Sequence, residues 1–310
     1  MEVERGEVVS PRRSTTHRLF RAKGVIPPVV TPFADDGKRV DVGALERLCN
    51  FLIERGVHGL FALGTTGEGA SLSVEERKIV AEQIVRCVRG RVPVLIHAGA
   101  VTTAMTIELA RHARDVGADA ASVIFPYYYR HNERDVIGHY QQVARAVPDF
   151  PIYLYFGRNA LSPEGVRRIR ASVPNVVGMK DSTHSYDMLM DYLATLGEDF
   201  SVLEGHESFA LGALVMGTDG MIAALATVFP EPLIDLYDLF QKGDYERARA
   251  RQFFINRLQK VVYGEAPYAR IKQALAFRGV NVGPPRAPLA PCTEEEARAL
   301  RTALEGLDVL

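Results

Sequence analysis

The sequence predicts a (β/α)8 TIM barrel followed by additional C-terminal helices. Eight short apolar runs recur along the chain, and a stretch with helical periodicity follows each of them. Nearly all the runs are apolar throughout instead of alternating, which is typical of parallel strands covered on both faces. Eight such units in about 200 residues fit a barrel, with a doubly wound open sheet as the alternative. The runs begin at Gly24, Val57, Val92, Ala118, Pro151, Asn175, Phe200 and Asp219.

Capping signals mark the ends of the predicted helices. Ser73 precedes a periodic stretch and has Glu76 three positions later, which is the spacing of a capping box. Ser162 followed by Pro163 marks a second helix start, because proline is favoured at the first helical position. Three glycines each follow a periodic stretch and precede the next strand, where a left-handed C-terminal cap is expected. They are Gly56, Gly90 and Gly117.

We divide the chain into three parts. Residues 1–22 are polar and mixed in charge, and we interpret them as a flexible N-terminal arm, because they lack the apolar segment of a secretion signal. Residues 23–235 hold the eight strand runs and form the predicted catalytic barrel. Residues 236–310 have a helical pattern, and we expect these helices to pack on the barrel or on a second subunit.

The composition excludes several classes of partner. The 310 residues carry 37 basic and 38 acidic side chains, so nothing draws the chain toward nucleic acid or an anionic membrane. No apolar run approaches the ~20 residues that a membrane span needs. The three cysteines form no CxxC pair, which favours a reduced, cytoplasmic protein. We therefore expect small molecules or further copies of the chain as partners.

The turn after the second predicted strand suits an anionic ligand. Residues 64–69 read GTTGEG, and this glycine-rich turn can expose backbone N–H groups beside the hydroxyls of Thr65 and Thr66. The combination is suited to a carboxylate or a phosphate, and Gly64 opens the turn. It lacks the GK[ST] ending of a P-loop and the pattern of a dinucleotide turn. An ordinary strand-to-helix turn is the alternative reading.

Lys180 ends a run that otherwise reads as a fully buried strand. Burial disfavours the charged ammonium relative to the neutral amine, and a neutral amine can attack a carbonyl carbon. The alternatives are a side chain that reaches solvent, or an ion pair with Asp181. Adjacent residues on a strand point to opposite faces, so Asp181 is poorly placed to neutralise the ammonium. We therefore interpret Lys180 as a reactive lysine at the mouth of the barrel.

Tyr155 ends the strand before the lysine strand. Forming and collapsing a carbinolamine requires protons to be delivered and removed at one atom, and a phenol beside the lysine can do both. We assign this role to Tyr155. The other tyrosines nearby, Tyr127, Tyr129 and Tyr153, are expected to serve in packing.

Four motifs together resemble one known family. They are GTTGE at 64–68, PYY at 126–128, LY at 154–155 and VGMKD at 177–181. The chain is similar over nearly all its length to the dihydrodipicolinate synthase and N-acetylneuraminate lyase family of class I aldolases. The resemblance implies a homotetramer in which Lys180 forms a Schiff base with a 2-oxo acid such as pyruvate. It implies no cofactor and no metal, because the iminium replaces a Lewis acid.

The resemblance also assigns roles to individual residues. Thr65 and Thr66 would hold the carboxylate, and Tyr155 would relay protons while linked to Thr65. Tyr128 matches a tyrosine that reaches into a neighbouring subunit's site in the synthase branch. Ile222 matches a position whose backbone carbonyl faces bound pyruvate.

Departures from the synthase pattern concern the second substrate. Where the synthase branch has Asn, an apolar residue and Pro, followed by an arginine, this chain reads Phe156, Gly157, Arg158 and Asn159, and the segment is shorter. Residues 97–103, HAGAVTT, are closer to the lyases and sugar-acid aldolases. Arg158 and His206 remain candidate contacts for the aldehyde half. His206 and the neighbouring Glu207 have a second reading, in which they only open the next helix.

We therefore expect reversible cleavage of a 2-oxo-3-deoxy sugar acid to pyruvate and an aldehyde. The alternatives are 4-hydroxy-tetrahydrodipicolinate synthase and a keto-deoxy sugar-acid dehydratase. A non-catalytic barrel that binds a ligand is the hypothesis from another class. The eight histidines show no HxxxH or HExxH spacing, so His97 is expected to line the site and not to bind a metal.

Overall fold

The computed structural model describes residues 20–157 and 160–310 and confirms the predicted barrel. One eight-stranded parallel sheet runs in the order β1-β10-β9-β8-β7-β6-β5-β4. Each of the eight predicted apolar runs contains one strand of this sheet. The strands are β1 (Gly24–Val25), β4 (Leu60–Ala62), β5 (Val94–His97), β6 (Ala120–Ile124), β7 (Ile152–Phe156), β8 (Val176–Asp181), β9 (Ser201–Glu204) and β10 (Gly220–Met221).

The first and last strands of this order meet, so the sheet curls back on itself. Phe61 on β4 donates its backbone N–H to the Pro27 carbonyl and accepts from the Val29 N–H, at 3.0 and 2.8 Å. A parallel bridge between Pro28 and Phe61 lies at the same place. Because closure leaves no free strand edge, the open sheet that was the alternative is excluded.

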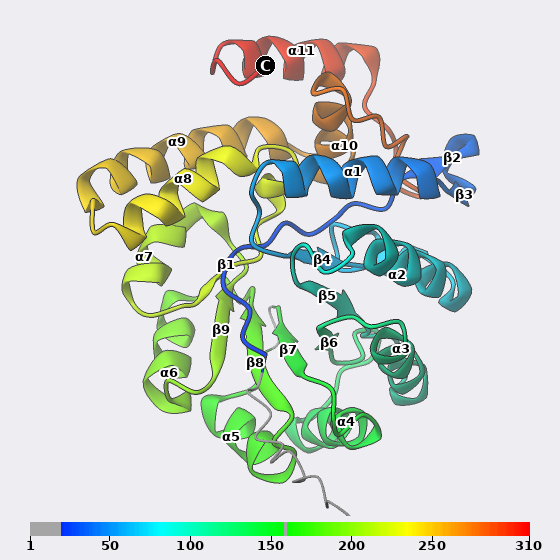
Figure 1. Cartoon of the computed structure of the whole chain (residues 1–310), viewed down its shortest axis with the longest axis vertical. Helices are drawn as coiled ribbons and strands as arrows, with labels where there is room; N and C mark the ends of the chain where they lie inside the picture. The colour runs from blue at the N-terminus through cyan, green and yellow to red at the C-terminus, as the bar shows by residue number, and fades with distance from the viewer. Residues whose placement is uncertain (1–19, 158–159) are drawn as a thin grey trace, which may run out of the picture.

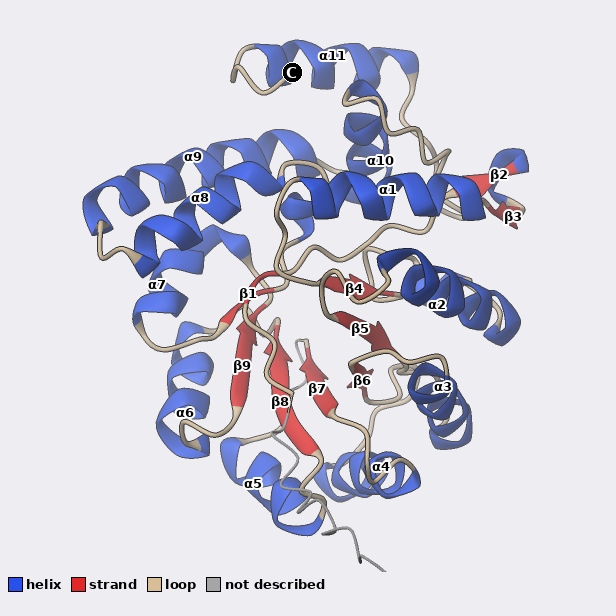
Figure 2. Ribbon diagram, in the orientation of Figure 1, coloured by secondary structure: helices blue, strands red, loops and turns tan. Residues whose placement is uncertain are grey.

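Helices surround the ring of strands, as Figures 1 and 2 show. A short antiparallel pair, β2 (Phe33–Ala34) and β3 (Arg39–Val40), precedes the first long helix. The barrel helices are α1 (Val42–Glu54), α2 (Val74–Val88), α3 (Thr103–Asp115), α4 (Glu133–Ala146), α5 (Pro163–Ser172), α6 (Tyr186–Leu196), α7 (Ala210–Val215) and α8 (Pro230–Gln241). Short 3-10 turns are η1 (Asp35–Gly37), η2 (Gly69–Ser71), η3 (Glu207–Phe209) and η4 (Ala224–Thr227).

The predicted capping signals are confirmed. Ser73 and Glu76 form the reciprocal capping box of α2, and Ser162 caps α5 with Pro163 in its first turn. Positive φ angles of 82°, 68° and 87° occur at Gly56, Gly90 and Gly117. Local sequence and observed structure therefore agree at these ends.

Three further helices follow the barrel at one end of the molecule in Figure 1. They are α9 (Tyr245–Tyr263), α10 (Pro267–Phe277) and α11 (Glu294–Glu305). α8 contacts both β1 and α9, and α10 contacts α9 and α11. The C-terminal helices are thus packed on the barrel in a continuous series. Within the described residues, no helix is both long and apolar enough to span a membrane.

The described part of the N-terminal arm is attached to the bottom of the barrel. Residues 1–19 lie outside the described residues. Arg21 forms an ion pair with Asp219 at 2.8 Å, and the Ala22 backbone N–H donates to the Tyr153 hydroxyl at 2.9 Å. Ala22 and Tyr153 belong to the apolar cluster inside the barrel, which confirms the expected packing role of Tyr153.

Candidate active site

Lys180 lies inside the mouth of the barrel, next to aromatic rings. It sits on β8 in register with Tyr155 on β7. Its Nζ is 4.3 Å from the centre of the Tyr155 ring and 5.0 Å from that of Phe61, and the residue is 6% exposed. No carboxylate of the described residues pairs with it, and Asp181 instead accepts from the Thr183 backbone N–H at 2.9 Å. The alternation of the strand thus separates the amine from the neighbouring acid.

Tyr155 connects the lysine to the glycine-rich turn. Its hydroxyl oxygen lies 3.2 Å from Thr65 Oγ1. Burial acts to raise the pKa of Tyr155, but the positive charge of Lys180 and hydrogen bonding with Thr65 outweigh it. The pKa of this phenol is therefore lowered from its usual 10, as suits a group that gives and takes protons near neutral pH.

The GTTGEG turn is held tightly by its own backbone. Glu68 has a φ of 53°, its N–H donates to the Thr65 carbonyl at 3.1 Å, and the Gly69 N–H donates to the Gly64 carbonyl at 3.1 Å. A Cβ at Gly69 would lie 1.9 Å from the Leu63 carbonyl oxygen, so the close approach requires glycine. Thr65 is exposed at the mouth and Thr66 is buried. The turn thus offers the Thr65 hydroxyl to a ligand beside Tyr155.

A cavity of about 300 Å³ opens beside this arrangement. Thr65, Tyr155 and the expected lining residue His97, at the end of β5, form part of its wall. Two further wall residues were not placed at the site by the sequence, Tyr268 on α10 and Leu289 after α10. Tyr268 and Leu289 come from the C-terminal region, so that region contributes directly to the site. Their spacing in the sequence carries no signal of this contact.

His97 lines the cavity as a neutral imidazole. Burial first, and then the charges of Arg77 and Lys180, lower the pKa of His97 well below its usual 6.5. Arg77 is itself buried and donates to the backbone carbonyls of His97 at 2.7 Å and Gly99 at 2.9 Å. His97 Nδ1 is buried without a protein partner. The expectation that His97 lines the site agrees with this geometry, and no group of three or more metal-binding side chains occurs in the described part of the chain.

Comparison with known proteins identifies the family. The model of the dihydrodipicolinate synthetase family matches residues 21–307. The chain belongs to this family. It is 34% identical over 295 residues to 4-hydroxy-tetrahydrodipicolinate synthase of Methanopyrus kandleri, covering 94% of this chain and 98% of the relative. The corresponding enzyme of Thermus thermophilus is 36% identical over 296 residues, with the same coverage.

Solved structures of the family superimpose on the whole barrel. YagE from E. coli K12, solved in complex with pyruvate, has a TM-score of 0.88 and 33% identity, over 93% of this chain and 99% of that one. Dihydrodipicolinate synthase from Aquifex aeolicus has a TM-score of 0.88 and 31% identity, over 93% and 98%. As a member of the dihydrodipicolinate synthetase family, the chain is an enzyme of the Schiff-base-forming aldolase class.

The tyrosine-rich loop of this family member projects outward. Tyr128 is 77% exposed and lies against Tyr129 with ring centres 4.9 Å apart. Tyr127 and Tyr129, which were expected to serve in packing, are 46% and 71% exposed and do not pack in the core of this chain. Tyr127 instead lines the cavity beside Thr65 and Tyr155. The run of apolar residues before Tyr127 ends at Phe125, and the loop beyond it has left the core. Tyr128 therefore does not join Thr65 and Tyr155 within one chain.

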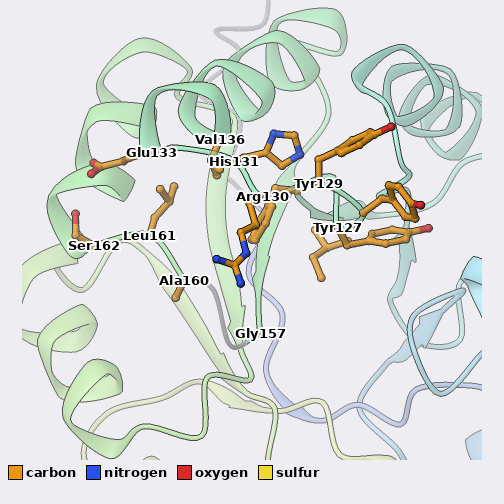
Figure 3. A pocket seen from close by; sticks show the side chains of 13 residues that line it. Tyr127, Tyr129, Arg130, His131, Glu133, Val136, Gly157, Ala160, Leu161 and Ser162 are labelled. Atoms are coloured by element: carbon orange, nitrogen blue, oxygen red, sulfur yellow. The ribbon is translucent and has the colours of Figure 1, made fainter.

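A second cavity, of about 790 Å³, lies between this loop and the segment after β7. Figure 3 shows the Arg130 side chain directed toward Gly157 across the space, with Ala160 and Leu161 on the same side as Gly157. The predicted contact Arg158 lies outside the described residues. Phe156 is fully buried between Tyr140 and Tyr192 and cannot contact a substrate.

The remaining predicted residues lie just after β10 and just after β9. Ile222 is buried inside the barrel, and its N–H donates to the Glu204 carbonyl at 2.8 Å. His206 lies against His184 with ring centres 3.3 Å apart, and burial lowers its pKa to about 4, helped by the charges of His184 and Lys180. Glu207 is buried, where it accepts from Tyr263 and from the Leu225 N–H. Glu207 thus serves the structure at the start of η3, and only His206 remains a candidate contact.

Two buried acids, Glu204 and Asp181, lie beneath the mouth, and Glu204 was not singled out from the sequence. Glu204 accepts from the His206 N–H at 2.7 Å, and its Oε2 is buried without a partner. Burial, followed by the nearby Asp181 charge, raises the pKa of Glu204 to about 8. Burial likewise raises the pKa of Asp181. These carboxyl groups flank the ends of β8 and β9, on the side of the strands away from Lys180.

Proposed function

We propose that the protein forms a Schiff base between Lys180 and a 2-oxo acid of the pyruvate type. One arrangement carries the proposal: a buried lysine without an acidic partner lies beside a phenol of lowered pKa, and that phenol is linked to a threonine in an anion-binding turn. The named complex of YagE with pyruvate supports the same ligand class. The hydroxyl of Thr65 and the turn that includes Thr66 hold the carboxylate.

Lys180 and Tyr155 carry out different steps of imine formation. The neutral amine of Lys180 attacks C2 of the 2-oxo acid, and the carbonyl electrons move to oxygen, which takes a proton from Tyr155. The nitrogen then gives one of its protons to the Tyr155 phenolate, which passes it to the same oxygen, so that water leaves and the iminium remains. In the cleavage direction, the C4 hydroxyl gives its proton to Tyr155, the electrons of the C3–C4 bond flow into the iminium, an aldehyde departs and an enamine forms. In the condensation direction, the enamine attacks the aldehyde carbon instead.

The relatives favour 4-hydroxy-tetrahydrodipicolinate synthase as the overall activity. Relatives with that name are 34% and 36% identical to this chain over nearly their full length. The chain would then condense pyruvate with the aldehyde substrate of the synthase. The names of these relatives therefore support the synthase activity more strongly than they support a sugar-acid lyase.

One observation keeps sugar-acid cleavage as the second candidate. The residue after the relay tyrosine is Phe156, which is buried between Tyr140 and Tyr192. The synthase branch that the sequence resembles has a polar asparagine there. Phe156 itself does not reach a substrate, but it belongs to the segment after Tyr155 that is shorter than in the synthase branch, and Gly157 of that segment lines the larger cavity. Reversible cleavage of a 2-oxo-3-deoxy acid to pyruvate is therefore the second candidate, with dehydration of such an acid as a variant.

Trapping with borohydride tests the shared chemistry. Reduction in the presence of pyruvate should add one three-carbon adduct to Lys180, located by peptide mass spectrometry, and Lys180→Ala should add none. Unchanged mass at saturating pyruvate would overturn the proposal. Product analysis then separates the activities: the synthase consumes pyruvate together with its aldehyde, a lyase releases pyruvate from 2-oxo-3-deoxy acids, and a dehydratase converts them without releasing pyruvate.

The exposed loop supports a proposal about assembly. Tyr128 is directed away from its own site, and the family resemblance implies that such a tyrosine completes a neighbouring site. We assign the protein as a homotetramer of the cytoplasm, where its three free cysteines remain reduced. Light scattering coupled to gel filtration measures the mass, and a monomer at micromolar concentration that has full activity would contradict the assignment.

A further inference from the structure

A buried ion pair connects the C-terminal helices to the glycine-rich turn. Lys272 Nζ on α10 lies 2.6 Å from Glu68 Oε1, and the two side chains are 2% and 1% exposed. Lys272 also donates to the carbonyls of Thr31 at 2.8 Å and Pro284 at 3.0 Å. The other Glu68 oxygen accepts the Arg286 backbone N–H at 2.8 Å. Glu68 Oε1 has the Lys272 ammonium as its ion-pair partner and accepts no further hydrogen bond within the described residues.

Glu68 belongs to the same turn that supplies the proposed carboxylate cradle. Its N–H donates to the Thr65 carbonyl, and the Ser71 N–H donates to the Glu68 carbonyl at 2.8 Å. Glu68 also contributes to the wall of the cavity that Thr65 and Tyr155 line. A carboxylate is therefore built into the turn that is expected to bind a second carboxylate.

Two negative charges at such a site repel each other strongly unless a cation compensates one of them. The interaction between unit charges is several-fold stronger in a buried, low-dielectric setting than in water. Lys272 forms the ion pair with Glu68 in the described structure. The guanidinium of Arg286 pairs with Glu76 instead, at 2.7 Å, so Lys272 is the cation that compensates Glu68. An unpaired Glu68 would face an incoming anionic substrate directly.

We propose that Lys272 is a positioning residue for catalysis, which neutralises Glu68 and so lets the turn accept an anionic 2-oxo acid. The inference rests on the proposed function, because it takes the turn as the carboxylate site. It assigns to the C-terminal helices a role in substrate binding, besides packing. If the ion pair only braced the turn, removing either partner would damage the turn equally. Binding of charged and uncharged ligands would then be weakened alike.

The experiment uses the full-length chain with four variants. They are Lys272→Met, Glu68→Gln, the double variant and, as a control, Lys78→Met, which removes a lysine from an exposed Lys–Glu pair at 2.5 Å. The measured quantity is the half-saturating concentration of pyruvate for imine trapping by borohydride, compared with that of the uncharged analogue pyruvamide. Circular dichroism checks that each variant is folded.

Charge compensation predicts a distinct pattern. Lys272→Met should raise the half-saturating concentration of pyruvate about tenfold while leaving that of pyruvamide nearly unchanged, because only the anion is repelled. Glu68→Gln should bind pyruvate as well as or better than the wild type, and the double variant should return to within about twofold of it. Lys78→Met should match the wild type for both ligands.

Three results would overturn the inference. One is an equal loss for pyruvate and pyruvamide in Lys272→Met, and another is a double variant as weak as that single variant. The third is a tenfold loss of pyruvate affinity in Glu68→Gln. This variant alone tests the inference if Lys272→Met does not fold. Failure of the proposed function is distinguishable from all three, because the wild type would then trap no adduct at any pyruvate concentration.

Discussion

The hydroxyl oxygens of Tyr155 and Thr65 lie 3.2 Å apart, although 90 residues separate them in the chain. The barrel brings them together because β7 and the turn after β4 end at the same rim. Lys180 lies against the same phenol, with its Nζ 4.3 Å from the ring centre. The phenol therefore contacts both the proposed carboxylate-binding residue and the proposed reactive lysine.

Loss of the Thr65 hydroxyl should raise the pKa of Tyr155. Hydrogen bonding with Thr65 is one of the effects that lower this pKa, after burial, which raises it, and the charge of Lys180, which lowers it. Thr65→Val removes one lowering effect and leaves the others in place. Ultraviolet difference titration, with Tyr155→Phe as the reference, measures the phenol directly. A Tyr155 pKa that stays the same in Thr65→Val would contradict the link between the two groups.

Tyr155→Phe should slow imine formation without preventing it. A positioned general acid and base typically contributes about 10²- to 10⁴-fold to a rate, so the trapping rate at saturating pyruvate should fall by a factor in this range. The ring remains, so the packing against Lys180 and Phe61 should be kept. Rapid-quench borohydride trapping measures the rate, and a loss of less than about threefold would remove Tyr155 from the proton relay.

Lys180→Met should abolish the adduct and stabilise the fold. The amine is buried between aromatic rings without an acidic partner, and an apolar side chain of similar length avoids the cost of desolvating it. We expect a gain of about 1–2 kcal/mol in the free energy of unfolding, measured by urea titration. A destabilised Lys180→Met variant would show that the lysine serves the fold and not only the chemistry.

Glu204 should make stability depend on pH. Its pKa is about 8 in the folded protein, where burial and the Asp181 charge raise it from 4.5. Between these two values the folded protein holds a proton that the unfolded chain has released. The free energy of unfolding should therefore fall as the pH rises from about 4.5 through about 8, by an amount on the order of 4 kcal/mol.

Glu204→Gln tests this dependence, because the amide cannot ionise. Asp181 and Glu207 face the same site from β8 and η3, so they should add a smaller dependence that persists in the variant. Glu108→Gln, in an exposed ion pair with Lys78, is the control. Urea unfolding at about pH 5 and about pH 9 gives the comparison, and equal slopes in the wild type and Glu204→Gln would refute the assignment.

Asn175 should contribute to stability far from the site. Its Nδ2 lies within hydrogen-bonding distance of the carbonyls of Ala144, Val147 and Phe150, at 3.0, 2.9 and 3.1 Å. Asn175→Ala removes these contacts and leaves the Phe150 carbonyl without a donor among the described residues, whereas the Ala144 and Val147 carbonyls keep backbone N–H donors. The change should cost about 2–3 kcal/mol of the free energy of unfolding. Ser73→Ala, which removes an exposed helix cap, should cost about 1 kcal/mol. Thermal unfolding should therefore rank the two variants in this order.

The order of strands and the chemistry at their ends could be predicted from the sequence. Continuous apolar runs, glycine caps and a capping box are local signals, and each identifies an element whose neighbours follow from the barrel topology. The lysine, the phenol and the threonine turn were then located by the rule that a barrel's site lies at its strand ends. Thr65, Tyr155 and Lys180 are brought together in the structure as this rule predicts.

Other features depend on packing between distant segments, which a sequence pattern does not encode. Tyr268 and Leu289 reach the cavity only because the C-terminal helices fold back over the barrel mouth. Tyr127 and Tyr129 follow an apolar strand and look like core residues, yet the loop carries Tyr129 into solvent and places Tyr127 in the cavity wall. The raised pKa of Glu204 arises from burial next to Asp181, a neighbour from another strand.

The turn that contains Glu68 is synthesised well before the C-terminal segment that pairs with it. Glu68 and Arg286, whose backbone N–H it accepts, are 218 residues apart, and Lys272 lies near the later end of that interval. A ribosome therefore delivers the turn long before the groups that neutralise it. The nascent barrel holds an unpaired acid at its future active site until α10 emerges. A segment that is synthesised about 200 residues after the turn thus completes the proposed ligand-binding turn.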